Sequence, residues 1–171
     1  FWCVKLVLVA WVFLLVACAP NNSPKEAQVS REPPKIKVTT TVNMVSDLVR
    51  QIGAGHVEVV EIMGPGVDPH LYKASANDVV KLQEADAIFY VGLLLEGKME
   101  EVLGKLKDGG KPVYAVTENI DANRLLKPDE FEGHFDPHIW FEVLLWKETI
   151  DGVVSSLGEL DPANKFDYEA N

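Results

Sequence analysis

Hydrophobic and polar residues alternate along the chain in two different periods from residue 36 onward. Short runs rich in β-branched and other apolar residues predict strands over 36–42, 57–63, 86–92 and 111–117. Apolar residues recur at helical spacing in four further segments, which predict helices over 44–55, 75–85, 96–110 and 140–160. The helix over 44–55 is closed by Gly53 and Gly55, and Ser75 or Asn77 can cap the helix over 75–85.

Strands separated by helices of this length imply βαβ units. We therefore predict an α/β fold built on a parallel four-stranded sheet flanked by helices. In such sheets, ligands gather at the carboxyl ends of the strands. The segments that follow the second strand and the fourth strand are accordingly the places where a site is expected.

The tripeptide Asp-Pro-His occurs in both of those segments, in GPGVDPHLY (64–72) and in GHFDPHIWF (133–141). Proline fixes its own φ and pushes the preceding Asp into extended geometry, so each His stands on a stiff support. A ligand that is already ordered loses less entropy on binding. Because both segments leave the same edge of the sheet, we expect His70 and His138 to meet and share a divalent transition metal, which imidazole suits.

The neighbouring carboxylates, Asp68 and Asp136, are expected to cap nearby amides or to hold an imidazole from behind, which would fix the ring nitrogen that faces the metal. The alternative is that each His is an ordinary loop residue after an Asp-Pro turn. The chain has four histidines, and the other two are weaker candidates. His56 is expected to be an exposed turn residue. His134 forms H-x3-H with His138, but the intervening proline opposes the helix that this spacing needs.

The amino-terminal stretch predicts export rather than fold. Residues 4–17 are apolar apart from Lys5, too short a run to span a bilayer and typical of a secretory signal. Residues 15–18, Leu-Val-Ala-Cys, resemble a bacterial lipobox. We expect 1–17 to be a lipoprotein signal peptide, Cys18 to carry lipid on the extracytoplasmic face of the membrane, and 18–35 to be a flexible tether. The alternatives are a signal that happens to contain Cys, or an uncut membrane anchor. Since Cys3 would leave with the signal, neither a disulfide nor a Cys metal site is expected.

Composition narrows the function classes. The 171 residues are 47% hydrophobic, which fits one domain, and the net charge of −10 argues against a nucleic-acid partner. An enzyme with a catalytic zinc on the two histidines and Glu142 as base is an alternative. The chain, however, carries no H-E-x-x-H, G-x-S-x-G or P-loop motif. We therefore expect a binding protein, not an enzyme.

The lipobox, the segment GPGVDPHLYKASANDVVKLQEADAIFYVGLLLEGKMEEVL (64–103) and FDPHIWFEV (135–143) together resemble the metal-binding lipoproteins of bacterial zinc/manganese ABC importers. This is the cluster A-I (cluster 9) solute-binding family, and the chain is most similar to its TroA-like members. The resemblance implies two α/β lobes joined by a long helix, with the metal buried between them. The amino-terminal lobe supplies two His ligands, which fall on His70 and His138. The other lobe supplies a His or Glu and then an Asp.

The resemblance also implies domain limits and partners. Residues 36–160 would form the amino-terminal lobe of a TroA-like (helical backbone) metal receptor, and 161–171 the start of the inter-lobe helix. The chain would then hold half of the site and bind metal weakly by itself. The expected function is to capture Mn²⁺ or Zn²⁺ and deliver it to an ABC permease in the cytoplasmic membrane; a surface adhesin is the alternative. The absence of His in 118–133 favours manganese or mixed use.

Overall fold

In the computed structural model, residues 34–171 are described. Their four strands are all parallel and lie in the order β2-β1-β3-β4. The strand bounds are Ile36–Thr40 for β1, Val57–Glu61 for β2, Ala87–Tyr90 for β3 and Val113–Ala115 for β4. The predicted parallel four-stranded sheet is therefore confirmed. Its order changes direction between β1 and β3, the two inner strands.

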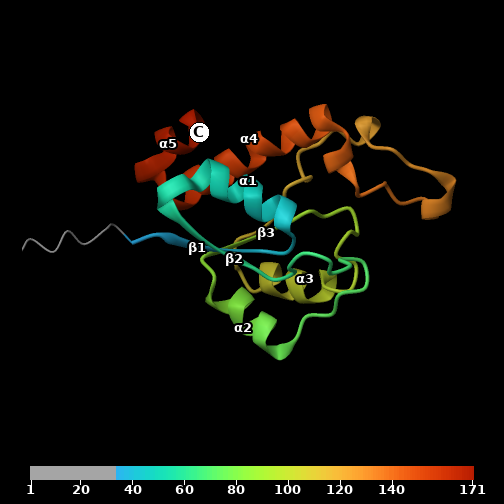
Figure 1. Cartoon of the computed structure of the whole chain (residues 1–171), viewed down its shortest axis with the longest axis horizontal. Helices are drawn as coiled ribbons and strands as arrows, with labels where there is room; N and C mark the ends of the chain where they lie inside the picture. Colours follow the sequence, from blue (N-terminus) through green and yellow to red (C-terminus); the bar gives the residue numbers. More distant parts are fainter. Residues whose placement is uncertain (1–33) are drawn as a thin grey trace, which may run out of the picture. The chain divides into compact units, whose positions relative to one another are not determined.

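Helices cover both faces of this sheet, as predicted. The helix bounds are Asn43–Gly53 for α1, Ala76–Glu84 for α2, Glu100–Asp108 for α3, Val143–Leu160 for α4 and Lys165–Ala170 for α5. Helices α1, α4 and α5 lie on one side of the sheet, and α2 and α3 lie on the other (Figure 1). The carboxyl ends of the strands thus open into loops between these two helical layers.

The core is apolar and centred on the inner strands. Val38 of β1 and Ile88 of β3 are fully buried, and α1 covers them with an apolar stripe at helical spacing: Val45, Leu48, Val49 and Ile52. Burial of apolar surface contributes roughly 25 cal/mol per Å² to the free energy of folding. This burial therefore stabilises the sheet that carries the loops at its edge.

Helix α2 begins with a capping box. The Ser75 side chain accepts a hydrogen bond from the backbone N–H of Asp78, and the Asp78 side chain accepts one from the backbone N–H of Ser75. Of the two capping residues that the sequence offers, Ser75 is the one used.

Helix α3 begins at Glu100, four residues later than predicted. The predicted first residue, Glu96, instead turns its carboxylate back onto the backbone N–H groups of Val91 and Gly92. The intervening Leu93 and Leu94 both have left-handed φ, 54° and 66°. The side-chain bonds of Glu96 thus hold a tight turn where the hydrophobic periodicity alone indicates helix.

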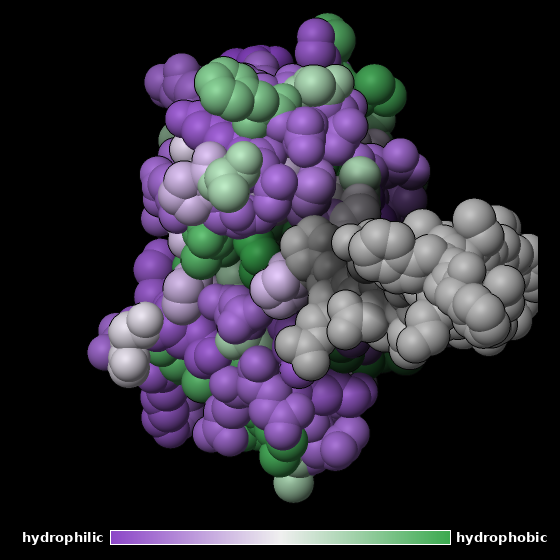
Figure 2. Space-filling model, turned by 90° about the vertical axis from the view of Figure 1, so that its left-hand side faces the viewer, coloured by the Kyte–Doolittle hydropathy of each residue, from purple (hydrophilic) through white to green (hydrophobic). Residues whose placement is uncertain are grey.

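The face of the domain shown in Figure 2 is largely hydrophilic, with its hydrophobic side chains in small separate groups. Within residues 34–171, no helix combines the length and the apolar character that crossing a membrane requires. The predicted signal peptide (1–17), Cys18 and most of the predicted tether (18–35) lie outside the described residues.

Candidate metal-binding site

The two Asp-Pro-His histidines meet above the carboxyl edge of the sheet. His70 lies in the loop between β2 and α2, and His138 lies just before Ile139–Phe141, a 3₁₀ turn (η4) that precedes α4. These loops leave the two outer strands. The Nε2 atoms of the two rings are 3.3 Å apart, and the ring centroids are 5.3 Å apart. The structure therefore brings together two side chains that are 68 positions apart in sequence.

The separation of these nitrogens suits a shared ion. Two nitrogen ligands at about 2.0–2.1 Å from a tetrahedral zinc lie about 3.3–3.4 Å from each other. The observed 3.3 Å between the two Nε2 atoms falls at that value. Without an ion, the same distance allows one ring nitrogen to donate a hydrogen bond to the other.

His138 is held by its own Asp. One carboxylate oxygen of Asp136 accepts from the backbone N–H of His138 at 3.0 Å and from Nδ1 of its ring at 2.7 Å. Trp140 packs edge-on against the same ring. Burial acts to raise the pKa of Asp136, but the hydrogen bonds from the backbone and ring of His138 outweigh burial and lower the pKa. With Nδ1 donating to Asp136, Nε2 carries the lone pair that faces His70.

His70 is held differently. Asp68 accepts only from the backbone N–H of His70, at 2.9 Å, and residues 34–171 provide no hydrogen-bond partner for Nδ1 of the His70 ring. Asp136 both caps a backbone amide and holds an imidazole ring, the two roles expected from sequence, whereas Asp68 only caps a backbone amide. Two identical tripeptides thus hold their histidines by different means.

A hydrogen-bond cluster that sequence reasoning missed follows His70. The hydroxyl of Tyr72 donates to Asp78 at 2.7 Å, and the same Asp78 oxygen accepts from Ser75. Burial acts to raise the pKa of Asp78, but the bonds from Ser75 and Tyr72 and the charge of Lys81 bring it to about 2. The bond to Asp78 raises the pKa of Tyr72 to about 12. The S-x-x-D spacing of the capping box was the available signal, but it does not indicate Tyr72.

A second missed residue lies at the carboxyl ends of the two inner strands. The Glu96 side chain is 1% exposed and accepts from the hydroxyl of Thr41 at 2.6 Å as well as from the amides of Val91 and Gly92. Burial raises the pKa of Glu96, although these hydrogen bonds act to lower it. Its carboxylate joins the ends of β1 and β3, where the strand order changes direction. No motif in the sequence marks this role.

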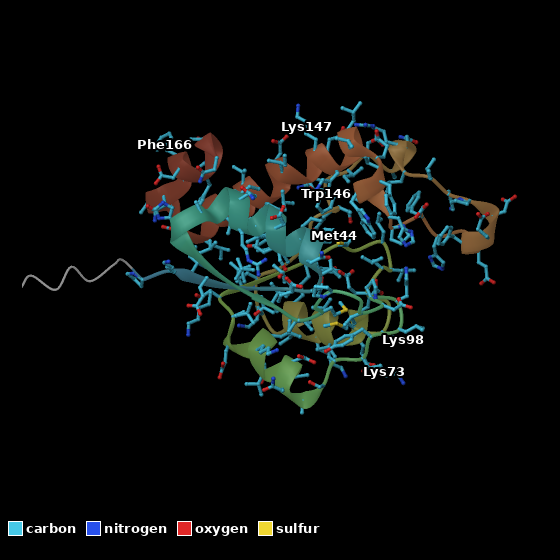
Figure 3. All side chains as sticks on the ribbon, in the orientation of Figure 1. Met44, Lys73, Lys98, Trp146, Lys147 and Phe166 are labelled. Carbon is cyan, nitrogen blue, oxygen red and sulfur yellow. The ribbon has the colours of Figure 1, made fainter. Side chains whose placement is uncertain are left out.

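A cavity of about 440 Å³ adjoins the two histidines. It is lined by the segment 42–44, the segment 63–70, Leu95, His138 and Trp140. Met44 stands at its wall, at the start of α1 (Figure 3). The paired imidazoles therefore face a space bounded mainly by apolar side chains.

The remaining candidates lie elsewhere. His56 is not the exposed turn residue expected from sequence, because it is half-buried, and its Nε2 lies 2.9 Å from a carboxylate oxygen of Asp167. His134 is exposed, and no described contact joins it to His138. Glu142 uses its carboxylate to cap α4, where it accepts from backbone amides. Within residues 34–171, no group of three or more His, Cys, Asp or Glu side chains is placed to hold a metal.

The fold and the site together define an α/β ligand-binding lobe that presents two imidazoles at the carboxyl edge of a parallel sheet. The chain belongs to the family described as "Zinc-uptake complex component A periplasmic", whose model matches residues 38–171. The family resemblance found in the sequence is thereby confirmed.

Individual relatives agree with this placement. The chain is 40% identical to the manganese-binding lipoprotein MntA of Bacillus subtilis, over 93% of this chain and 50% of that protein. It is 47% identical to the zinc-binding protein TroA of Treponema pallidum, over 77% of this chain and 42% of that protein. The solved structure of the Treponema pallidum TroA superposes with a TM-score of 0.76 and 44% identity, over 80% of this chain and 48% of that chain.

The chain thus spans about half the length of the relatives it matches. Their names describe metal-binding proteins and a lipoprotein, not enzymes. The predicted one-lobe, TroA-like fold is confirmed by the superposition.

Proposed function

We propose that this protein is an extracytoplasmic receptor that captures a divalent transition metal, Mn²⁺ or Zn²⁺, and passes it to an ABC permease in the cytoplasmic membrane. One observation carries the proposal: in a chain of this family, the two Asp-Pro-His histidines place their Nε2 atoms 3.3 Å apart at the carboxyl edge of the sheet.

His70 and His138 are the proposed ligands from this lobe. Neutral imidazole binds through the lone pair of Nε2, and both Nε2 atoms point at one another. Asp136 supports the assignment of His138, since it holds Nδ1 and leaves Nε2 for the ion. Two imidazoles leave the rest of the coordination shell open, so the family's two further ligands, a His or Glu and an Asp, would complete it.

The choice of metal depends mainly on those further ligands, because carboxylate favours manganese and additional imidazole favours zinc. The relatives include a protein named for each metal. The lack of His in residues 118–133 supports manganese or mixed use.

We propose Cys18 as the lipid attachment site. A lipid there would keep the receptor beside its permease and raise its effective concentration at the membrane. Fatty-acid labelling of cells that express the protein tests this assignment: incorporation should be lost in Cys18→Ser and kept in Cys3→Ser. Label that survives in Cys18→Ser would rule out Cys18.

The metal site is tested by calorimetric titration of the protein with Zn²⁺ and with Mn²⁺. His70→Ala and His138→Ala should each weaken binding by about tenfold or more, because losing a ligand costs at least as much as losing its supporting partner. His134→Ala, in the same loop as His138, is the matched control and should bind like the wild type. Equal affinities in all four proteins would refute the proposed site.

A further inference from the structure

The two histidines differ in what fixes them. The ring of His138 is tied to Asp136 through Nδ1. The ring of His70 has no such tie among the described residues, so its position depends on the backbone that carries it.

The loop around His70 has few anchors of its own. The last hydrogen bond to the sheet before it runs from the N–H of Met63 to the carbonyl of Thr41. From 64 to 71, the described hydrogen bonds are local, Val67 to Gly64 and His70 to Asp68, apart from the contact with His138 itself. These residues are exposed or half-buried. The segment that presents His70 is therefore held mainly at its two ends.

Its carboxyl-terminal end is held by Tyr72, two residues after His70. The Tyr72 ring packs against the hydrophobic core, and its hydroxyl donates to Asp78 at 2.7 Å. Asp78 is itself only 4% exposed and is fixed by the amide and hydroxyl of Ser75, at the start of α2. A hydrogen bond to a buried, fully oriented carboxylate is both strong and directional. We call this pair the Tyr72–Asp78 clamp.

We propose that Tyr72 and Asp78 are positioning residues for His70, and that the clamp does for His70 what Asp136 does directly for His138. The inference rests on the proposed metal-binding function, whose ligand it positions. Ligand groups must be held to within about 0.5 Å to act as a preorganised site. Releasing the loop end next to His70 lets its imidazole move away from His138.

The test uses Tyr72→Phe, which removes one hydroxyl and keeps the ring. Two variants are controls. Tyr114→Phe removes a hydroxyl for which the described part of the chain shows no hydrogen bond, from a half-buried ring that stacks on Phe89. Ser75→Ala removes the capping hydroxyl of α2 and with it one of the bonds that hold Asp78, but keeps the bonds that Asp78 accepts from Tyr72 and from the backbone amide at position 75. It therefore loosens the helix start and weakens the support of the clamp without breaking the link between Tyr72 and Asp78.

Two measurements are made on the wild type and on each variant. Imidazole ¹H–¹⁵N spectra of the metal-free protein should show the His70 signals shifted or broadened in Tyr72→Phe, whereas the Nδ1 signal of His138, which is held by Asp136, should be unchanged. Calorimetric titration with Zn²⁺ alone should show an affinity weaker by about tenfold or more in Tyr72→Phe, the cost of one hydrogen bond to a charged group. Tyr114→Phe should match the wild type in both readouts, and Ser75→Ala should lose thermal stability while changing the His70 signals less than Tyr72→Phe does.

Unchanged His70 signals in Tyr72→Phe would overturn the inference, and so would an equal loss of affinity in Ser75→Ala. If His70→Ala abolishes Zn²⁺ binding but Tyr72→Phe binds normally, the clamp is refuted and the proposed function stands. If the wild type does not show even the weak Zn²⁺ binding expected of one lobe, the proposed function fails, whereas a His70-specific change in the metal-free spectra still supports the clamp as a positioning device.

Discussion

The unequal roles of Asp68 and Asp136 lead to a sharp prediction for a pair of matched variants. In Asp136→Asn, the side-chain oxygen can still accept from the ring of His138, but the acceptor is neutral. In Asp68→Asn, the oxygen can still cap the backbone N–H of His70, and no ring contact is altered. Both variants remove one negative charge, so the general attraction of this acidic protein for cations changes equally.

The size of the difference follows from the contacts. A hydrogen bond to a charged group contributes about 1.5–3 kcal/mol and a neutral one about 0.5–1.5 kcal/mol. Asp136→Asn should therefore cost about 1–1.5 kcal/mol of metal binding, or about fivefold to tenfold in Kd. Asp68→Asn should stay within about twofold of the wild type, since the bond that it weakens orients the backbone and not the imidazole.

Calorimetric titration with Zn²⁺ measures both values, and thermal unfolding of the metal-free proteins checks that each variant is folded. An equal or larger loss in Asp68→Asn would refute the reasoning. So would an unchanged affinity in Asp136→Asn, because the 2.7 Å contact between Asp136 and Nδ1 of His138 would then contribute nothing to binding.

Three further outcomes are expected. Glu96→Gln should lower the free energy of unfolding in urea by about 1–3 kcal/mol, because the amide must turn one N–H toward another donor; an unchanged midpoint would contradict this. Gly92→Ala should destabilise by about 1–3 kcal/mol in the same assay, since φ is 89° and a Cβ would lie 2.8 Å from Oγ1 of Thr117; wild-type stability would be the contrary result. The pKa of Asp78 lies near 2, below its ordinary 3.8, so its ionised side chain contributes up to about 2 kcal/mol to the free energy of unfolding at neutral pH. That contribution is lost as the pH falls from about 4 to 2. The stability of Asp78→Asn should therefore depend less on pH over that range than the stability of the wild type.

Periodicity and topology were enough to predict the sheet, its helical layers and the meeting of His70 with His138. The reason is that parallel strands carry every following loop to the same edge. The predicted start of α3 was wrong. The carboxylate of Glu96 accepts hydrogen bonds from residues at the ends of β1 and β3, and the local sequence pattern does not encode where those two strands lie. The different hydrogen bonds that Asp68 and Asp136 accept could not be predicted either. Their tripeptides are identical, and only the ring orientations in the folded chain separate them.

The two histidines also belong to the loops of the outermost strands, β2 and β4, so a bound ion would connect opposite margins of the sheet. Local opening of either margin would then have to break the same link. The free energy of ion binding, which depends on the ion concentration relative to Kd, would therefore increase the free energy of local opening at both β2 and β4. Amide hydrogen exchange at β2 and at β4 should accordingly slow in concert as the ion is titrated in. Binding and release of the ion would then slow and speed exchange together in two strands that are not neighbours in the sheet.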